Sequence, residues 1–208
     1  HFRMLTVAIA SELVAPSGGV NGTVSPSSYS HSRSLDATET VSVKMSEVGV
    51  FRFTATPVTG GYLGKTVPEG TSEPTGRFYP DRFNVTIDEG ALGAHCGAPT
   101  PFNYTGQDIS WLLAPTLTIE ALSMDGVRTR NYTEPGFQKL VKEDVIRTFP
   151  VEDSSAVNRE NESIDVSTNV SPGEELSVAE PGLLQFNYAA GDTVRYLKVP
   201  EARVAPLT

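Results

Sequence analysis

Histidine, cysteine and serine are the side chains most often used in nucleophilic catalysis, and this chain of 208 residues has three histidines and one cysteine. A nucleophile needs a base within hydrogen-bonding reach. Cys96 directly follows His95, but neighbouring side chains of an extended chain point in opposite directions. His1 lies at the terminus and His31 in a serine-rich segment, and no G-x-S-x-G elbow occurs. The sequence therefore predicts no catalytic residues and no enzymatic activity.

Metal and cofactor sites have little support in the sequence. One cysteine and three scattered histidines are too few for zinc. Gly60–Thr66 resembles a phosphate-binding loop, but its first spacing is one residue short and Val67-Pro68 cannot begin the required helix. We therefore predict no metal and no cofactor, with calcium as the alternative because its ligands are loop oxygens. The acidic residues near predicted strand ends are Asp81, Asp88, Glu89, Asp125 and Asp192.

Aromatic rings are the remaining candidates for ligand contact. Trp111, Tyr104 and Tyr132 could stack on a sugar ring, which makes a carbohydrate-binding module the alternative function. Leu112 and Leu113 follow Trp111 and favour a core position for that ring. Glycoside cleavage would need two facing carboxylates, whereas the acidic pairs of this chain are neighbours in sequence only.

Charge and composition exclude several classes of partner. The net charge of −9 disfavours nucleic acid and anionic lipid. No segment approaches the roughly 20 apolar residues of a membrane helix, so we expect no direct membrane insertion. A single cysteine forbids an intrachain disulfide, which is compatible with the cytosol and with bacterial export.

The chain begins at His1 without a signal pattern, and we expect it to be a piece of a longer protein.

Alternating apolar residues predict an all-β fold with short strands. Thr40–Thr56 is expected to form two strands with a bulge or tight turn at Gly49. Leu117, Ile119 and Ala121 alternate in a further strand, which a turn at Asp125-Gly126 connects to a return strand over Val127–Tyr132. One or two helical turns are expected within Pro135–Ile146.

The spacing of strands and turns favours tandem immunoglobulin-like β-sandwich modules. We place the first module at 1–75 and the second at 76–208. The first is short enough to be incomplete or to share a strand with the second. An aromatic-rich stretch separates them and is interpreted as a rigid connector because glycine and proline fix its backbone. We expect Phe78 and Phe83 to be largely buried. The connector residues are Gly76, Arg77, Phe78, Pro80 and Phe83.

Several short motifs resemble those of the MshQ-like family, large surface proteins encoded with the mannose-sensitive haemagglutinin type IV pilus of Gram-negative bacteria. The stretch Gly76–Phe83 resembles the family's G-R-F-x-P-x-x-F motif, and Cys96 lies where the family often has a lone cysteine. Phe102–Gln107 is similar to its F-x-Y-x-G-[QE] element. Further similar elements are Glu47–Phe51, Tyr62–Gly64, Thr118–Ala121, Asp125-Gly126 and Asn131–Thr133.

The resemblance implies a location and a context and names no catalytic residue. It implies an exported protein at the extracellular surface of a Gram-negative bacterium, associated with pilus biogenesis or adhesion. We therefore predict a non-enzymatic structural or adhesive module. Its expected partners are other domains of the parent protein, pilus components or surface glycans.

Overall fold

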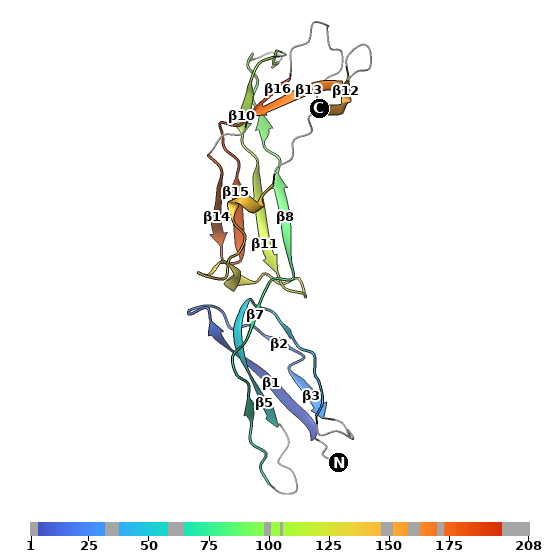
Figure 1. The fold of residues 1–208 in the computed structure, drawn as a ribbon, viewed down its shortest axis with the longest axis vertical. Helices are drawn as coiled ribbons and strands as arrows, with labels where there is room; N and C mark the ends of the chain where they lie inside the picture. Colours follow the sequence, from blue (N-terminus) through green and yellow to red (C-terminus); the bar gives the residue numbers. More distant parts are fainter. Residues whose placement is uncertain are drawn as a thin grey trace. The chain divides into compact units, whose positions relative to one another are not determined.

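The protein has an all-β fold with several sheets, which confirms the all-β part of the prediction, whereas the immunoglobulin-like modules stay a prediction (Figure 1). The computed structural model describes residues 4–31, 38–57, 65–97, 101–104, 106–146, 152–157, 163–169 and 173–196. Of residues 4, 5, 31, 152–157, 163–169 and 196 it describes the backbone alone. The Gly60–Gly64 part of the loop considered for phosphate binding, and with it Tyr62–Gly64, lies outside the described residues.

The chain divides into two compact units that alternate along the sequence. The first unit comprises 1–85, 119–139 and 178–184. The second comprises 86–118, 140–177 and 185–208. The modules expected at 1–75 and 76–208 stay a prediction.

The first unit contains a sheet of order β3-β1-β5-β6, in which β7 also pairs with β5. The long strands β1 and β5 run antiparallel, with Leu13 opposite Phe51 (Figure 1). A separate two-stranded sheet pairs β2 with β4. The bounds are β1 (Met4–Ala15), β2 (Val24–Ser25), β3 (Ser28–His31), β4 (Lys44–Met45), β5 (Gly49–Pro57), β6 (Gly70–Thr71) and β7 (Thr75–Phe78).

The predicted strands of Thr40–Thr56 are present as β4 and β5. Gly49 has φ of +155°, and the pairing of β5 with β7 is irregular between Gly49 and Phe51, as a bulge requires. A Cβ atom at Gly49 would lie 2.7 Å from the Ala15 carbonyl oxygen. Glycine is therefore needed here for its conformation and for the close approach of β1.

A four-stranded sheet has the order β14-β15-β11-β8. Leu117, Ile119 and Ala121 are buried on one face of β11, as their alternation predicts. Leu184 and Phe186 are buried on β15 in the same way. The bounds are β8 (Arg82–Asp88), β11 (Thr116–Leu122), β14 (Glu175–Glu180) and β15 (Leu183–Asn187).

A five-stranded sheet of the second unit has the order β12-β13-β16-β10-β9. Ile109 of β10 pairs with Val194 of β16 and is buried. Asp108 next to it binds the Arg195 guanidinium with two hydrogen bonds of 2.8 and 2.7 Å. The bounds are β9 (Ala91–Leu92), β10 (Ile109–Leu113), β12 (Glu152–Val157), β13 (Ser163–Asn169) and β16 (Thr193–Tyr196).

One local prediction needs correction and a second is confirmed. The Asp125-Gly126 turn is present, since the Gly126 N–H donates to the Ser123 carbonyl, but the return segment forms one bridge, Leu122 to Arg128, before it turns into a 3-10 helix. This helix is η1 (Arg130–Thr133). The turns expected within Pro135–Ile146 amount to the 3-10 helix η2 (Lys142–Asp144).

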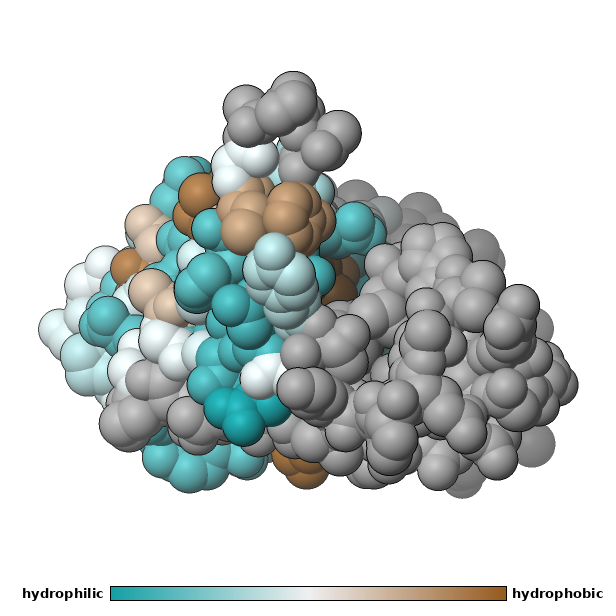
Figure 2. All heavy atoms as spheres, turned by 90° about the horizontal axis from the view of Figure 1, so that it is seen from above, coloured by the Kyte–Doolittle hydropathy of each residue, from teal (hydrophilic) through white to brown (hydrophobic). Residues whose placement is uncertain are grey.

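Large hydrophobic side chains also reach the surface. In Figure 2 hydrophobic atoms lie among predominantly hydrophilic ones on the face that it draws. By exposed area, the large hydrophobic residues at the surface include Leu112, Leu113, Val141 and Ile146. Separate exposed apolar side chains are normal for a folded domain, so the core is better defined by its buried members.

Phe51 tests the core of the first unit. Its fully buried ring meets Phe78 edge-on, with centroids 5.8 Å apart. We expect Phe51→Ala to lower the free energy of unfolding by about 3–5 kcal/mol because it leaves a cavity. Urea unfolding followed by circular dichroism measures this loss. Phe83→Ala is the matched control, and an equal loss in both variants would contradict the assignment of Phe51 to the core.

Candidate functional site

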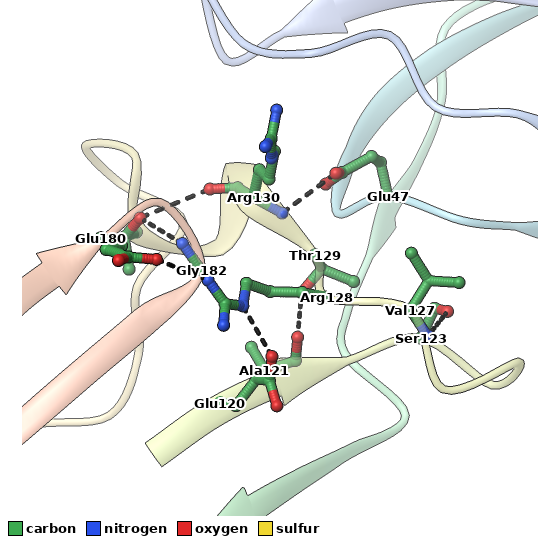
Figure 3. A network of polar contacts seen from close by, with 11 residues as sticks. Glu47, Glu120, Ala121, Ser123, Val127, Arg128, Thr129, Arg130, Glu180 and Gly182 are labelled. Atoms are coloured by element: carbon green, nitrogen blue, oxygen red, sulfur yellow. Dashed lines mark hydrogen bonds and ion pairs between the residues drawn. The ribbon is translucent and has the colours of Figure 1, made fainter. Parts of the chain in front are cut away.

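The candidate functional site is a cluster of hydrogen-bonded polar groups around the buried carboxylate of Glu47. Glu47 lies between β4 and β5 and is buried. Its Oε1 accepts a hydrogen bond from the Arg130 N–H at 3.0 Å (Figure 3). Its Oε2 accepts one from the Asn131 N–H at 3.1 Å. These N–H groups open η1, where the first donors have no partner within the helix. Thr129 at the N-cap makes no side-chain capping bond, so the distant Glu47 carboxylate caps the turn.

Burial and hydrogen bonding act on the Glu47 carboxyl in opposite directions. Desolvation raises its pKa above the ordinary value of 4.5. Hydrogen bonds from the backbone N–H groups of Arg130, Asn131 and Val48 lower the pKa, and desolvation is the larger effect. The backbone donors therefore stabilise the charged carboxylate less than water would.

Asn131 connects the same turn to two other segments. Its side-chain Oδ1 accepts from the Val20 N–H at 2.7 Å, and its Nδ2 donates to the Val20 carbonyl at 2.8 Å and the Val48 carbonyl at 2.9 Å. The residue is 1% exposed. Its amide thus pairs with Val20 as a neighbouring strand would. A Cβ atom at Gly19 would lie 2.7 Å from Asn131 Oδ1, so glycine permits this approach. We call Val20, Glu47, Val48, Arg130 and Asn131 the Glu47–Asn131 network.

Thr129 and Thr133 tie η1 to neighbouring segments. The Thr129 N–H and hydroxyl both donate to the Ala121 carbonyl, at 2.8 and 3.1 Å. The Gly182 N–H donates to the Thr133 hydroxyl at 2.9 Å. Gly182 has φ of +78°, and a Cβ atom there would clash with the Thr129 carbonyl. The Pro181-Gly182 turn therefore needs glycine to lie against η1.

Arg128 forms an ion-pair cluster at the surface beside η1. Its guanidinium donates to Glu120 at 2.6 Å and to Glu180 at 2.8 Å (Figure 3). These hydrogen bonds, first that to Glu120, raise the pKa of Arg128. Ion pairs that remain partly exposed contribute little to stability because water screens them. Arg128 links Glu120 of β11 to Glu180 of β14.

The predicted connector residues pack in the first unit with unequal burial. Phe78 is half-buried between Phe51 and Phe53. The Arg77 guanidinium lies 4.5 Å from the centre of the Phe137 ring and donates to the Gly136 carbonyl at 2.9 Å. Pro80 is half-buried and Gly76, with φ of +129°, is exposed. That these residues form a rigid connector stays a prediction.

The expected burial of Phe83 is wrong. Its side chain is 41% exposed, and its ring touches the edge of Tyr132 with centroids 5.3 Å apart. Phe83 lies in β8, which has β11 as its strand neighbour and forms an edge of its sheet. A residue on an edge strand has fewer neighbours to cover it, which explains the exposure.

The three aromatic residues considered for sugar stacking have different surroundings. Tyr132 is 3% exposed, so its ring faces cannot stack on a ligand, and that assignment is wrong. Trp111 in β10 is half-buried. Tyr104 is exposed and meets Phe102 edge-on at 5.2 Å. Sugar contact by Trp111 and Tyr104 stays a prediction.

The described contacts of His95 and Cys96 include no hydrogen bond between their side chains of the kind that a catalytic pair needs. His95 is exposed and Cys96 is half-buried. The His95 N–H donates to the Asn103 side chain at 2.7 Å, and Cys96 bridges to Phe102 through its backbone. Across the described residues, His, Cys, Asp and Glu form no group of three that could hold a metal. None of the helices in that part of the chain has the length and hydropathy to cross a bilayer.

Comparison with protein families gives one match. Residues 47–208 match the family model described as DUF6701, third domain. The chain belongs to the DUF6701 family. Comparison with curated proteins and comparison with solved structures each found no match.

The Glu47–Asn131 network joins the DUF6701 region to the segment before it. The match begins at Glu47 and includes Asn131, whereas Val20 precedes it. Asn131 therefore hydrogen-bonds a segment outside the matched region to the DUF6701 domain.

Sequence reasoning did not identify Glu47 and Asn131 as site residues. Both belong to short elements that suggest the family resemblance, Glu47–Phe51 and Asn131–Thr133. Their joint occurrence was the available signal, because a glutamate and an asparagine 84 positions apart reveal no pairing by themselves. The structure shows that these elements meet through hydrogen bonds.

Asn131→Ala tests the network. The change leaves the N–H and carbonyl groups of Val20 and the Val48 carbonyl without their partner. We expect the free energy of unfolding to fall by about 2–5 kcal/mol, since the unsatisfied buried Val48 carbonyl costs about 1–3 kcal/mol and each part-buried bond to Val20 contributes about 0.5–1.5 kcal/mol. Urea unfolding measures this. Asn21→Ala is the matched control, because Asn21 makes an exposed bond to Ser11, and it should cost less than about 1.5 kcal/mol.

The raised pKa of Glu47 predicts a pH dependence. The folded protein binds this proton more tightly than the unfolded chain, so the contribution of Glu47 is fully present below its ordinary pKa of 4.5 and is lost as the pH rises through the folded pKa. Relative to Glu47→Gln, the stability of the native protein should fall from pH 4 towards neutrality. Urea unfolding at a series of pH values measures the difference.

The comparison with the variant cancels other titrations. The Arg195 hydrogen bonds lower the pKa of Asp108, whose contribution is lost as the pH falls. Both proteins contain Asp108. A difference between native protein and Glu47→Gln that is constant or rises with pH would contradict the role assigned to burial.

Proposed function

We propose that the chain is a non-enzymatic structural or adhesive module of a large exported surface protein. In this proposal it consists of tandem immunoglobulin-like β-sandwiches joined by the aromatic-rich connector. The parent protein is MshQ-like, lies at the extracellular surface of a Gram-negative bacterium, and takes part in pilus biogenesis or attachment. Its partners are the other domains of that protein, pilus components or surface glycans.

The Glu47–Asn131 network is the observation that carries this proposal. The buried Glu47 carboxylate and Asn131 amide form hydrogen bonds with backbone groups of three segments, which are separated by up to 111 positions in the sequence. Satisfied buried polar groups specify one arrangement of the segments that they connect. Such an arrangement suits a module that must keep its shape between other domains.

Two further observations support a role at a surface. The resemblance to MshQ-like proteins includes Glu47–Phe51 and Asn131–Thr133, the elements that supply the network. The acidic net charge of −9 favours solubility and disfavours nucleic acid as a partner. These features agree with a structural module and give no reason to expect turnover.

A carbohydrate-binding module is the alternative function. Tyr104 is exposed, and the Asn103 side chain holds the preceding loop by bonding Gly93 and His95. Because the loop is already ordered by these hydrogen bonds, the exposed Tyr104 ring can stack on a sugar without an entropic cost for ordering the loop. Saturable binding on a glycan array that is lost in Tyr104→Ala would favour this alternative.

Surface labelling and deletion test the structural proposal in the bacterium that carries the gene. We expect an antibody against this chain to label intact cells. Deletion of the parent gene should reduce surface pili or attachment, counted by electron microscopy and adhesion assay, while growth in minimal medium stays normal. Labelling only after lysis, together with normal pili and attachment, would contradict the proposal.

A further inference from the structure

We propose that a groove in the first unit binds an extended, uncharged peptide segment of a partner protein. The free edge of β4 pairs with the peptide backbone, and Met45, Tyr79 and Met124 form an apolar wall for its side chains. This inference goes beyond the proposed structural role, because it assigns a binding site and a class of ligand.

The groove has a volume of about 530 Å³. Ligand sites of folded proteins usually have volumes of about 300–1,000 Å³. Its lining comes from three parts of the first unit: the β4 region, the Arg77–Asp81 stretch, and residues beside the Asp125-Gly126 turn. The site therefore lies within one unit.

Residues of β4 contribute to the lining of the groove. Val43, Lys44 and Met45 belong to its lining, and Lys44–Met45 is β4. The sheet of β4 has two strands, so among the described residues β4 pairs with β2 on one side and with no strand on the other. The free edge of a strand offers backbone donors and acceptors to an extended peptide.

Part of the lining is apolar and accessible. The side chains of Tyr79 and Met124 are 64% and 61% exposed, and Phe78 and Pro80 beside Tyr79 are half-buried. Methionine adapts its shape to different partners, and a tyrosine buries a large area at little entropic cost. Together with Met45 these residues can enclose an aliphatic side chain.

The charged groups around the groove already have partners within the unit. Lys44 binds Asp125 at 3.0 Å, and Asp81 binds Arg82 at 3.0 Å. The Glu47 carboxylate binds two backbone N–H groups. The lining contains Lys44 and Arg77 beside Glu47 and Asp81, so its charges balance and attract no ligand of either net charge. Charge complementarity therefore favours a neutral segment.

The net charge of the chain favours another protein over a second copy of this chain as the ligand. The net charge of −9 makes copies repel each other. A neutral segment of a different protein meets no such repulsion. We therefore assign the groove to a partner segment, and self-association becomes an outcome of the test.

Methionine methyl groups give a direct readout. The chain has three methionines, of which Met45 and Met124 line the groove and Met4 begins β1. The whole chain is labelled with ¹³C-methyl methionine, and single Met→Leu variants assign the three signals. The probe is a capped, uncharged hexapeptide of alternating threonine and valine. We expect saturable shifts of the Met45 and Met124 signals and a constant Met4 signal.

Matched variants make the result specific. Tyr79→Ser should weaken binding at least about tenfold, as expected for a hot-spot aromatic residue. Tyr104→Ser, an exposed tyrosine of the second unit, should leave the affinity unchanged. Circular dichroism checks that both variants fold.

Several results would overturn the proposal. No shift at millimolar peptide would do so, as would equal shifts of all three signals. Equal binding of a peptide with methylated backbone amides would exclude strand pairing. The same shifts with methyl glucoside would assign the groove to a sugar, and shifts that depend on protein concentration alone would assign it to a second copy.

Discussion

Burial of polar side chains is stabilising only when their hydrogen-bonding atoms find partners. Glu47 and Asn131 meet that condition by bonding to backbone groups that would otherwise lack partners. The Arg130 and Asn131 N–H groups open a 3-10 helix, and Val20 lies in a segment between strands. Without the Glu47 side chain the Arg130 and Asn131 N–H groups would lose their acceptor, and without the Asn131 side chain the Val20 and Val48 backbone groups would lose their partner. The packing of these three segments in the first unit therefore depends on both side chains.

The network also explains the positions of several small residues. Gly19 lets the Val20 segment approach the Asn131 amide, and Gly22 lies so close to Glu47 that a Cβ atom would be 2.8 Å from the Glu47 Cβ. Gly182 allows its turn to lie against the Thr129 carbonyl. In each case glycine removes a side chain where two backbone segments meet. Glycine is expected at positions where segments that are distant in sequence pack closely together.

Local pattern predicted the fold better than the site. The alternation of Leu117, Ile119 and Ala121 identifies β11 because burial of one sheet face repeats every two residues. The Asp125-Gly126 turn is equally local. The bonds of Asn131 to Val20 span 111 positions, and no periodicity reports them. The exposure of Phe83 was missed because it depends on the place of β8 at a sheet edge, which a single strand sequence does not reveal.

Native-state hydrogen exchange tests the central claim most directly, namely that the network is a persistent part of the folded unit. The amide protons of Val20, Arg130 and Asn131 donate to Asn131 and Glu47 side chains. If the network is persistent, these three amides exchange as slowly as the core amides of β5 and β11, through unfolding of the unit. Exchange at the rate of an exposed loop would contradict the account, because it would show that the side-chain bonds open without unfolding.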